Sequence, residues 1–234
     1  MSMNRIPGLK AFAPAFVLAA VALAAPIASA ADLTQVPKAP EAESALTPYS
    51  PWQIRARALA VIPNDGGSVN GIGGSDLSYS NSVTPEVDFS YFFTRNIAAE
   101  LILGTTSANV NADGSIGSLG KLGKVWILPP TVTLQYHFTD FGKFQPYVGA
   151  GVNYTMFYNQ SSSGAATKLD VKNTFGAAVQ VGFDYMINDK WGVNVDVKKY
   201  YLRPDFDATV GGAKVKGTAK LDPWMVGAGV TYRF

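Results

Sequence analysis

The stretch Leu128–Met156, LPPTVTLQYHFTDFGKFQPYVGAGVNYTM, decides the fold. Apolar side chains stand at every second position on both sides of the short segment 139–143, which contains Gly142. An apolar period of two predicts β-strands, and two such runs joined by a short glycine-containing connection predict an antiparallel hairpin. If Tyr136 pairs with Val148, the large apolar side chains of both strands lie on one face of the hairpin.

This hairpin fits two kinds of β-protein. In a soluble sandwich or lipocalin-like barrel the apolar face points inward. In an outer-membrane barrel the apolar face meets lipid and the other face lines a narrow lumen. The second face here is poor in Lys and Glu and rich in Gly, Asn, Gln and Thr. That composition favours a crowded polar interior, although the hairpin by itself leaves both alternatives open.

The N-terminal residues indicate export. Residues 1–30 contain Arg5 and Lys10, an apolar run over 11–25 and the small-residue sequence 28–30, which together are typical of a secretory signal peptide. A retained membrane anchor is the alternative, but the apolar run is short and interrupted by proline. Beyond residue 30 there is no stretch of 18 apolar residues, so only strands could cross a membrane. Export combined with membrane-crossing strands indicates the outer membrane of a Gram-negative bacterium.

Charge and cysteine content exclude several other classes of protein. Without residues 1–30, which hold two basic residues and no acidic one, the 19 basic residues fall to 17 and balance the 17 acidic ones. No basic excess remains to attract nucleic acid. An exported chain with no Cys does not depend on disulfides for its stability.

The remaining sequence predicts a proline-rich periplasmic extension over residues 31–51 and a barrel over 52–234. Apolar alternation recurs in eight segments, separated in turn by short connections and by long ones at 63–83, 105–129, 158–173 and 202–221. The predicted strands are 52–62, 84–93, 97–104, 132–138, 148–156, 175–185, 191–198 and 224–234.

An even number of strands with alternating short turns and long loops is typical of outer-membrane barrels. Aromatic residues also gather at the short-turn ends of the strands, where an interfacial girdle belongs. They are Trp52, Tyr91, Phe93, Phe138, Phe144, Tyr185, Trp191, Tyr232 and Phe234. We therefore predict an all-β protein that folds as an eight-stranded antiparallel transmembrane β-barrel.

The predicted inward face carries charges of both signs. They are Arg55, Arg57, Glu86, Asp88, Glu100, Asp184, Asp196, Lys198 and Arg233. Charges in a confined space must pair, because an unpaired buried charge costs several kcal/mol. We predict a salt-bridged polar plug across the lumen, with a polar ion path as the less favoured alternative. Eight strands enclose little more than side chains or one small ligand, so a general porin is not expected.

Several segments resemble the outer-membrane protein W (OmpW) family over essentially the whole mature length. The segments on which this resemblance rests are WQIRARA at 52–58, FFTRNIAAEL at 92–101, LPPT at 128–131 continuing through LQYHF at 134–138, PYVGAGVNYT at 146–155, GFDY at 182–185, DP at 222–223 and the terminal YRF. The resemblance implies an eight-stranded barrel with a hydrophobic cavity towards its outer half. It further implies that small apolar molecules enter this cavity from outside and leave sideways into the membrane lipid. Phe234 resembles the terminal aromatic signal that the barrel-assembly machinery reads.

A ligand path can be outlined on these positions. Pro129 and Pro130 remove two ladder donors at the start of a strand, which either leaves a gap in the wall or merely ends a loop. The resemblance favours a lateral opening there. Other apolar residues that would line the cavity are Leu59, Ile102, Trp126, Leu128 and Met225. Trp126 and Leu128 could equally anchor the outer aromatic girdle.

Neither catalysis nor a cofactor is expected. His137 is the only His and the chain has no Cys, so a metal site lacks ligands. His137 is also predicted near a short turn, far from any nucleophile in the external loops, so no catalytic residues are assigned. We expect uptake of small apolar molecules. The alternative is a non-transporting barrel whose external loops act as a receptor, adhesion or stress-response surface.

Overall fold

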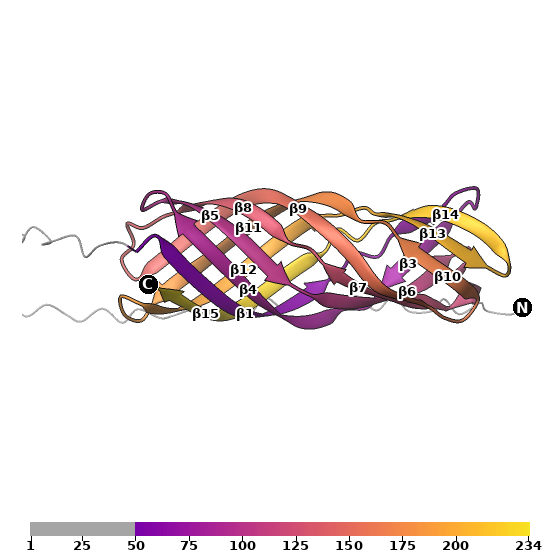
Figure 1. The fold of residues 1–234 in the computed structure, drawn as a ribbon, viewed down its shortest axis with the longest axis horizontal. Helices are drawn as coiled ribbons and strands as arrows, with labels where there is room; N and C mark the ends of the chain where they lie inside the picture. The colour runs from indigo at the N-terminus through magenta and orange to yellow at the C-terminus, as the bar shows by residue number, and fades with distance from the viewer. Residues whose placement is uncertain (1–49) are drawn as a thin grey trace, which may run out of the picture. The chain divides into compact units, whose positions relative to one another are not determined.

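The computed structural model describes residues 50–234 (Figure 1). The predicted signal peptide and nearly all of the predicted extension over 31–51 lie outside these residues. The described elements are β1 (Trp52–Ile62), β2 (Gly67–Val69), β3 (Ser75–Tyr79), β4 (Ser82–Phe92), β5 (Ile97–Gly104), β6 (Thr106–Gly114), the short 3-10 helix η1 (Gly117–Leu119), β7 (Lys121–Leu128), β8 (Thr131–His137), β9 (Phe144–Ser162), β10 (Ala166–Val171), β11 (Thr174–Met186), β12 (Trp191–Tyr201), β13 (Asp205–Val210), β14 (Ala213–Ala219) and β15 (Trp224–Arg233). None of the described residues belongs to a helix of the length and apolarity that a bilayer crossing requires.

Eight of these strands form a closed antiparallel barrel, as the sequence predicted. Around the ring the order is β1-β4-β5-β8-β9-β11-β12-β15, and β15 pairs again with β1. Gln53 stands opposite Arg233 at one end of this last seam, and Ile62 stands opposite Trp224 at the other. The predicted pairing of Tyr136 with Val148 is also present in the β8–β9 ladder.

The barrel turns its apolar side chains outward and its charged side chains inward. Val132, Leu134 and Val181 on the outer face are 53%, 59% and 56% exposed. Arg55 and Asp196 on the inner face are almost completely buried. A water-soluble barrel needs the opposite arrangement, so this distribution fits a wall that is surrounded by lipid.

The four segments predicted as long loops are largely strands, which corrects the sequence interpretation. They form an extension of the barrel at the end away from the C-terminus (Figure 1). One side of the extension is the sheet of β3, β6, β7 and the outer end of β9; the other is the sheet β10-β13-β14-β2. Gly, Ser and Asn made these segments resemble loops, but apolar residues alternate within them, as at Leu77 and Tyr79.

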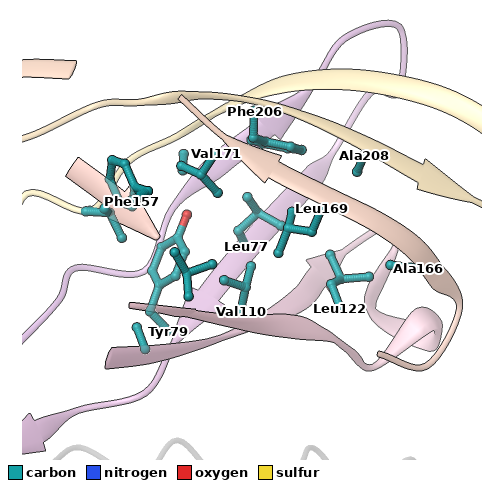
Figure 2. Close-up of a cluster of buried hydrophobic side chains, with 14 of the residues drawn as sticks. Leu77, Tyr79, Val110, Leu122, Phe157, Ala166, Leu169, Val171, Phe206 and Ala208 are labelled. Carbon is teal, nitrogen blue, oxygen red and sulfur yellow. The ribbon is translucent and has the colours of Figure 1, made fainter. Parts of the chain in front are cut away.

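The inward-facing residues of the extension form one apolar core (Figure 2). Its buried members come from both sheets and include Leu77, Val110, Leu122, Leu169 and Phe206. The extension is therefore built in the opposite sense to the barrel, with apolar residues inside and polar residues outside. Such an arrangement suits a structure that stands in water beyond the membrane.

Two inward-facing glycines allow neighbouring strands of the barrel to approach closely. A Cβ atom at Gly151 would collide with the carbonyl oxygen of Val132 on β8. One at Gly229 would collide in the same way with the carbonyl oxygen of Ala56 on β1. Backbone atoms cannot move away as the end of a flexible side chain can, so these positions require the absence of a side chain.

We predict that Gly151→Ala and Gly229→Ala each lower the free energy of unfolding by about 1–3 kcal/mol, the usual cost of overpacking. Urea titration in detergent micelles, followed by the folded fraction on unheated SDS gels, measures the loss. Gly73→Ala is the control, because a Cβ there meets no atom within 4 Å. An equal loss in the control would contradict the steric explanation.

We also predict that Val181→Arg destabilises the protein in lipid bilayers by about 2–4 kcal/mol, because the cation would face acyl chains near mid-height of the wall. Val181 lies between Val148 and Val197 on the neighbouring strands. Unfolding in bilayers is the measurement, and Ser78→Arg on the outward face of β3 is the control. A Val181→Arg protein as stable as the control would be inconsistent with lipid contact at this position.

Candidate functional site

Buried ion pairs fill the lumen of the barrel. Arg55 lies at the centre of the first group: its Nη1 is 2.7 Å from Glu100 Oε1 and its Nη2 is 2.7 Å from Asp184 Oδ2. All three side chains are fully buried. They come from β1, β5 and β11, so these ion pairs connect separate parts of the wall across the lumen.

Arg57 and Lys198 form the second group. Arg57 Nη2 contacts Asp88 and lies 2.9 Å from Glu86 Oε1. Lys198 Nζ lies 2.7 Å from Glu86 Oε1 and 2.7 Å from Asp196 Oδ1. Glu86 is therefore shared by two cations. Together the two groups bring eight of the nine charged residues predicted for the lumen into one cluster, which we call the polar plug: Arg55, Arg57, Glu86, Asp88, Glu100, Asp184, Asp196 and Lys198.

The ninth residue, Arg233, lies nearer the short-turn end and is only partly buried. Its guanidinium donates hydrogen bonds to Gln53 Oε1 and Gln145 Oε1, both at 2.6 Å. His137 is fully buried near the same end, where its ring lies between the rings of Phe92 and Tyr147. These side chains fill the lumen below the plug. Within residues 50–234, no group of three or more side chains suited to holding a metal ion comes together.

Apolar residues lie directly above the plug. Leu59, Ile102, Pro129 and Met225, four of the residues predicted for the ligand path, line the same small cavity of about 20 Å³. Glu86 of the plug lines this cavity as well, and so marks its lower limit. The change from charged to apolar lining therefore occurs within one layer of side chains.

Trp126 was assigned to the cavity lining, and the structure corrects this. Its side chain is 37% exposed on the outer face, beside Tyr158 and under the ammonium group of Lys124. Val125 and Ile127, its neighbours on β7, are the buried residues. The error arose because residues 125–128 were treated as part of a loop, where the alternation of a strand was not applied. Leu128 shares the face of Trp126, is half-buried, and ends β7 opposite Met156.

The strand ladder is interrupted beside Pro129 and Pro130. β8 pairs with β5 up to Thr131 opposite Ile102, and β7 pairs with β6 from Ile127 opposite Thr106. Residues 103–105 and 128–130 between these pairs have no ladder partners across this seam. The Thr105 hydroxyl, which donates to the carbonyl oxygen of Ile127 at 3.3 Å, partly replaces the missing ladder. The backbone ladder of the wall is thus interrupted where the small cavity meets Pro129.

Three small cavities follow one another from the extension to the plug. The outermost, about 30 Å³, lies within the apolar core of the extension (Figure 2) and shares Ala108, Ile127 and Leu221 with a second cavity of about 30 Å³. The second cavity shares Pro129 and Met225 with the one above the plug. Each holds no more than about one or two water molecules, so the protein's own side chains fill the interior.

Apolar side chains and a few aromatic rings line the outermost cavity. Figure 2 shows Tyr79, Phe157 and Phe206 around it. Tyr79 contributes the polar atom, and its hydroxyl donates to the carbonyl oxygen of Gly66 at 2.9 Å. Burial, and then the carboxylates of Asp76 and Asp65, raise the pKa of Tyr79, so the phenol stays neutral. An apolar molecule here would meet no charge.

Most of this lining was missed from the sequence, because it lies in the segments predicted as loops. Leu77, Val110, Leu122, Leu169 and Phe206 are the main examples. Phe157 lies between the predicted strand 148–156 and the predicted loop 158–173. The available signal was the short apolar alternation within those segments, as in Phe206, Ala208 and Val210 on β13. Strands of only five or six residues give few repeats of that pattern, so the turn-forming composition dominated the interpretation.

Comparison with known proteins agrees with this architecture. The model of the OmpW family matches residues 51–234. An uncharacterized outer-membrane protein, y4mB, from Sinorhizobium fredii is 59% identical over 88% of this chain and 90% of its own. The dibenzothiophene metabolism operon protein PahQ from Pseudomonas aeruginosa is 30% identical over 79% of this chain and 89% of its own.

A solved structure shows the same fold. The crystal structure of the outer membrane protein OprG from Pseudomonas aeruginosa superposes with a TM-score of 0.73 at 27% identity, covering 80% of this chain and 96% of that one. The family resemblance predicted from the sequence is thus confirmed. The chain belongs to the OmpW family, a non-enzymatic family of β-barrels in the bacterial outer membrane.

Proposed function

We propose that this protein takes up small apolar molecules through the core of its extension and releases them sideways into the lipid of the outer membrane. The observation that carries the proposal is the series of three apolar cavities that leads from the extension to the polar plug. An apolar molecule along this series would contact mainly apolar side chains, which favours its transfer from water. Several Ser and Thr residues line the second and third cavities as well, and Glu86 lines the third.

The polar plug supports a sideways release. An apolar molecule that reached the plug would have to separate Lys198 from Glu86 and Arg55 from Glu100 to continue along the axis. Breaking buried ion pairs is costly, because it leaves uncompensated charges. The interrupted ladder beside Pro129 and Pro130 opens at the same level, next to Leu59, Ile102 and Met225. We therefore propose this interruption as the exit.

The small size of the cavities has a consequence for the mechanism. A bicyclic aromatic molecule is much larger than 30 Å³, so side chains of the core must move apart when it enters. Contacts among apolar side chains would be exchanged for contacts with an apolar guest, which limits the energetic cost. The relative named for dibenzothiophene metabolism supports planar aromatic compounds as candidate ligands.

The alternative role, an external receptor or adhesion surface, has less support. On the outward face of β13 and β14, and at the end of β10, several charges pair with one another. Lys172 lies 2.8 Å from Asp170 and 3.1 Å from Asp207, and Lys216 lies 3.6 Å from Asp207. These paired charges offer less to a charged partner than free ones would. Lys168 and Lys214 on the same face are exposed and form no ion pair among the described residues.

Two further parts of the proposal concern export and assembly. We propose that residues 1–30 are removed as a signal peptide and that residues 31–51 form a periplasmic extension. We also propose Phe234 as the residue that the barrel-assembly machinery reads. Its ring is exposed beyond the end of β15, edge-on to Tyr232. That exposure is what recognition by another protein requires.

We predict that Ala108→Phe lowers the affinity for naphthalene by about tenfold, the factor that corresponds to the lower range of overpacking costs. Ala108 lines both outer cavities, and a phenyl ring there would fill them. Fluorescence titration in lipid nanodiscs measures the affinity, and circular dichroism checks the fold. Asn109→Phe, on the opposite face of β6, should bind as the unmodified protein does. Equal binding by both variants would exclude these cavities as the ligand site.

We predict that Lys198→Met destabilises the barrel by about 3–5 kcal/mol, because it leaves Glu86 and Asp196 with less compensation. The double variant Lys198→Met, Glu86→Gln should lose less than the sum of the single losses. Urea unfolding gives these energies. Ion conductance in planar bilayers should also rise in Lys198→Met, because an ion pair that fills the lumen is lost. If neither stability nor conductance changed in Lys198→Met, the charged cluster would not act as a plug.

A further inference from the structure

The outer end of β9 contains a bulge. On its β7 side, Lys124 stands opposite Ser161 and Trp126 stands opposite Tyr158, so two residues of β9, Asn159 and Gln160, face the single residue Val125. Asn159 has a φ of +44°, in the left-handed region. A bulge redirects the side chains around it. Here it turns the Gln160 side chain away from β7 and towards β10.

The Gln160 side chain closes a seam that has no strand ladder. The β10 strand pairs with β13, and the outer end of β9 pairs with β7, so no ladder joins β9 to β10 within the described chain. Gln160 Nε2 donates to the carbonyl oxygen of Val171 at 3.0 Å, and the Val171 N–H donates to Gln160 Oε1 at 2.5 Å. One side-chain amide thus takes the place of a backbone peptide group.

A second side-chain contact lies at the membrane-facing end of this seam. The N–H of Phe157 donates to Asn173 Oδ1 at 2.9 Å. Hydrogen bonds to side chains depend on rotamers that can change, whereas a ladder depends on the backbone alone. The β9–β10 seam is therefore easier to open than the ladders of the barrel.

The outermost apolar cavity lies directly behind the seam. Phe157, Leu169 and Val171 line this cavity (Figure 2). Two of them are held at the seam by side chains: Asn173 accepts from the Phe157 N–H, and Gln160 accepts from the Val171 N–H. Separating β9 from β10 would move one wall of the cavity. The seam also begins just beyond Phe175, which is 76% exposed and pairs with Tyr154 on β9. It therefore opens next to the apolar outer surface.

The corresponding seam on the other side of the extension is held by a backbone hydrogen bond as well as by side chains. Between β2 and β3, the Gly66 N–H donates to the carbonyl oxygen of Leu77 and the Tyr79 hydroxyl donates to that of Gly66. Ser75 Oγ accepts from the Val69 N–H at 2.9 Å. A backbone hydrogen bond thus lies along this seam. Short connections, 70–74 and 163–165, join the strands of both seams, but the backbone bond between β9 and β10, from the Ala166 N–H to the carbonyl oxygen of Ser163, lies within the connection at the outer end.

We propose that the β9–β10 seam is the door through which apolar molecules enter the outermost cavity, and that Gln160 controls its opening. This proposal rests on the proposed function and adds to it the site and the residue that govern access. Gln160 does not line the cavity, so its substitution should change how fast a ligand enters and leaves rather than how tightly it is held.

The test is stopped-flow binding of naphthalene to the full-length protein in nanodiscs. With Gln160→Ala, the association and dissociation rate constants should both rise on the order of tenfold, the factor expected when one or two net hydrogen bonds are lost, with an almost unchanged Kd. Gln160→Asn, whose side chain is one methylene shorter, should behave in the same way. The Val171 N–H should also exchange with solvent faster in both variants.

Ser75→Ala is the matched control, because it removes the side-chain hydrogen bond from the Val69 N–H at the opposite seam, together with the bond from Ser75 Oγ to the carbonyl oxygen of Ile72 in the adjacent connection. Its rate constants should equal those of the unmodified protein. If Ser75→Ala raised the rate constants as much as Gln160→Ala does, the β9–β10 seam would not be the entry site, and the proposed function would stand. The same conclusion would follow if Gln160→Ala left the rate constants unchanged although the Val171 N–H exchanged faster. An unmodified protein that binds no naphthalene would overturn both. If Gln160→Ala does not fold, Gln160→Asn decides between these outcomes.

Discussion

Backbone hydrogen bonding in the bilayer is the constraint on which this structure depends. Lipid offers no partner for a free N–H or C=O group, so strands can cross only as a closed ring. The ring of eight strands satisfies this requirement, and its last seam joins β1 to β15. Closure with eight strands leaves a lumen that side chains fill. In this protein the ion pairs of Arg55, Arg57 and Lys198 fill the lumen.

Beyond the membrane the same strands follow different rules. On β9 the inward positions change from Asn153 and Thr155 to Phe157, while the outward positions change from Val152 to Ser161. Water beyond the bilayer permits this reversal and also permits seams without ladders. The interior thus becomes apolar where the wall no longer needs complete backbone pairing. The proposed uptake of apolar molecules requires both conditions, and they coincide in the extension.

The sequence was sufficient for the barrel and insufficient for the extension. Long strands such as 175–185, with an apolar residue at every second position, predict both the strand and its face. The segments of the extension are rich in Gly, Ser and Asn, and some of their strands are short. In β3, with five residues, the alternation of Leu77 with Tyr79 is too brief to outweigh composition. Leu59, Ile102 and Met225, which the alternation predicts to face inward, line one cavity of the structure. Trp126 was misplaced, since the face of a residue cannot be assigned before its strand is recognised.

The β1–β15 seam has a consequence for biogenesis. Its two members stand at opposite ends of the barrel sequence, with Gln53 opposite Arg233. A nascent polypeptide therefore exposes two unpaired strand edges until its final residues have been synthesised. Such edges invite pairing with other chains. A chain without β15 would have no strand to join β12 to β1 and could not close the ring.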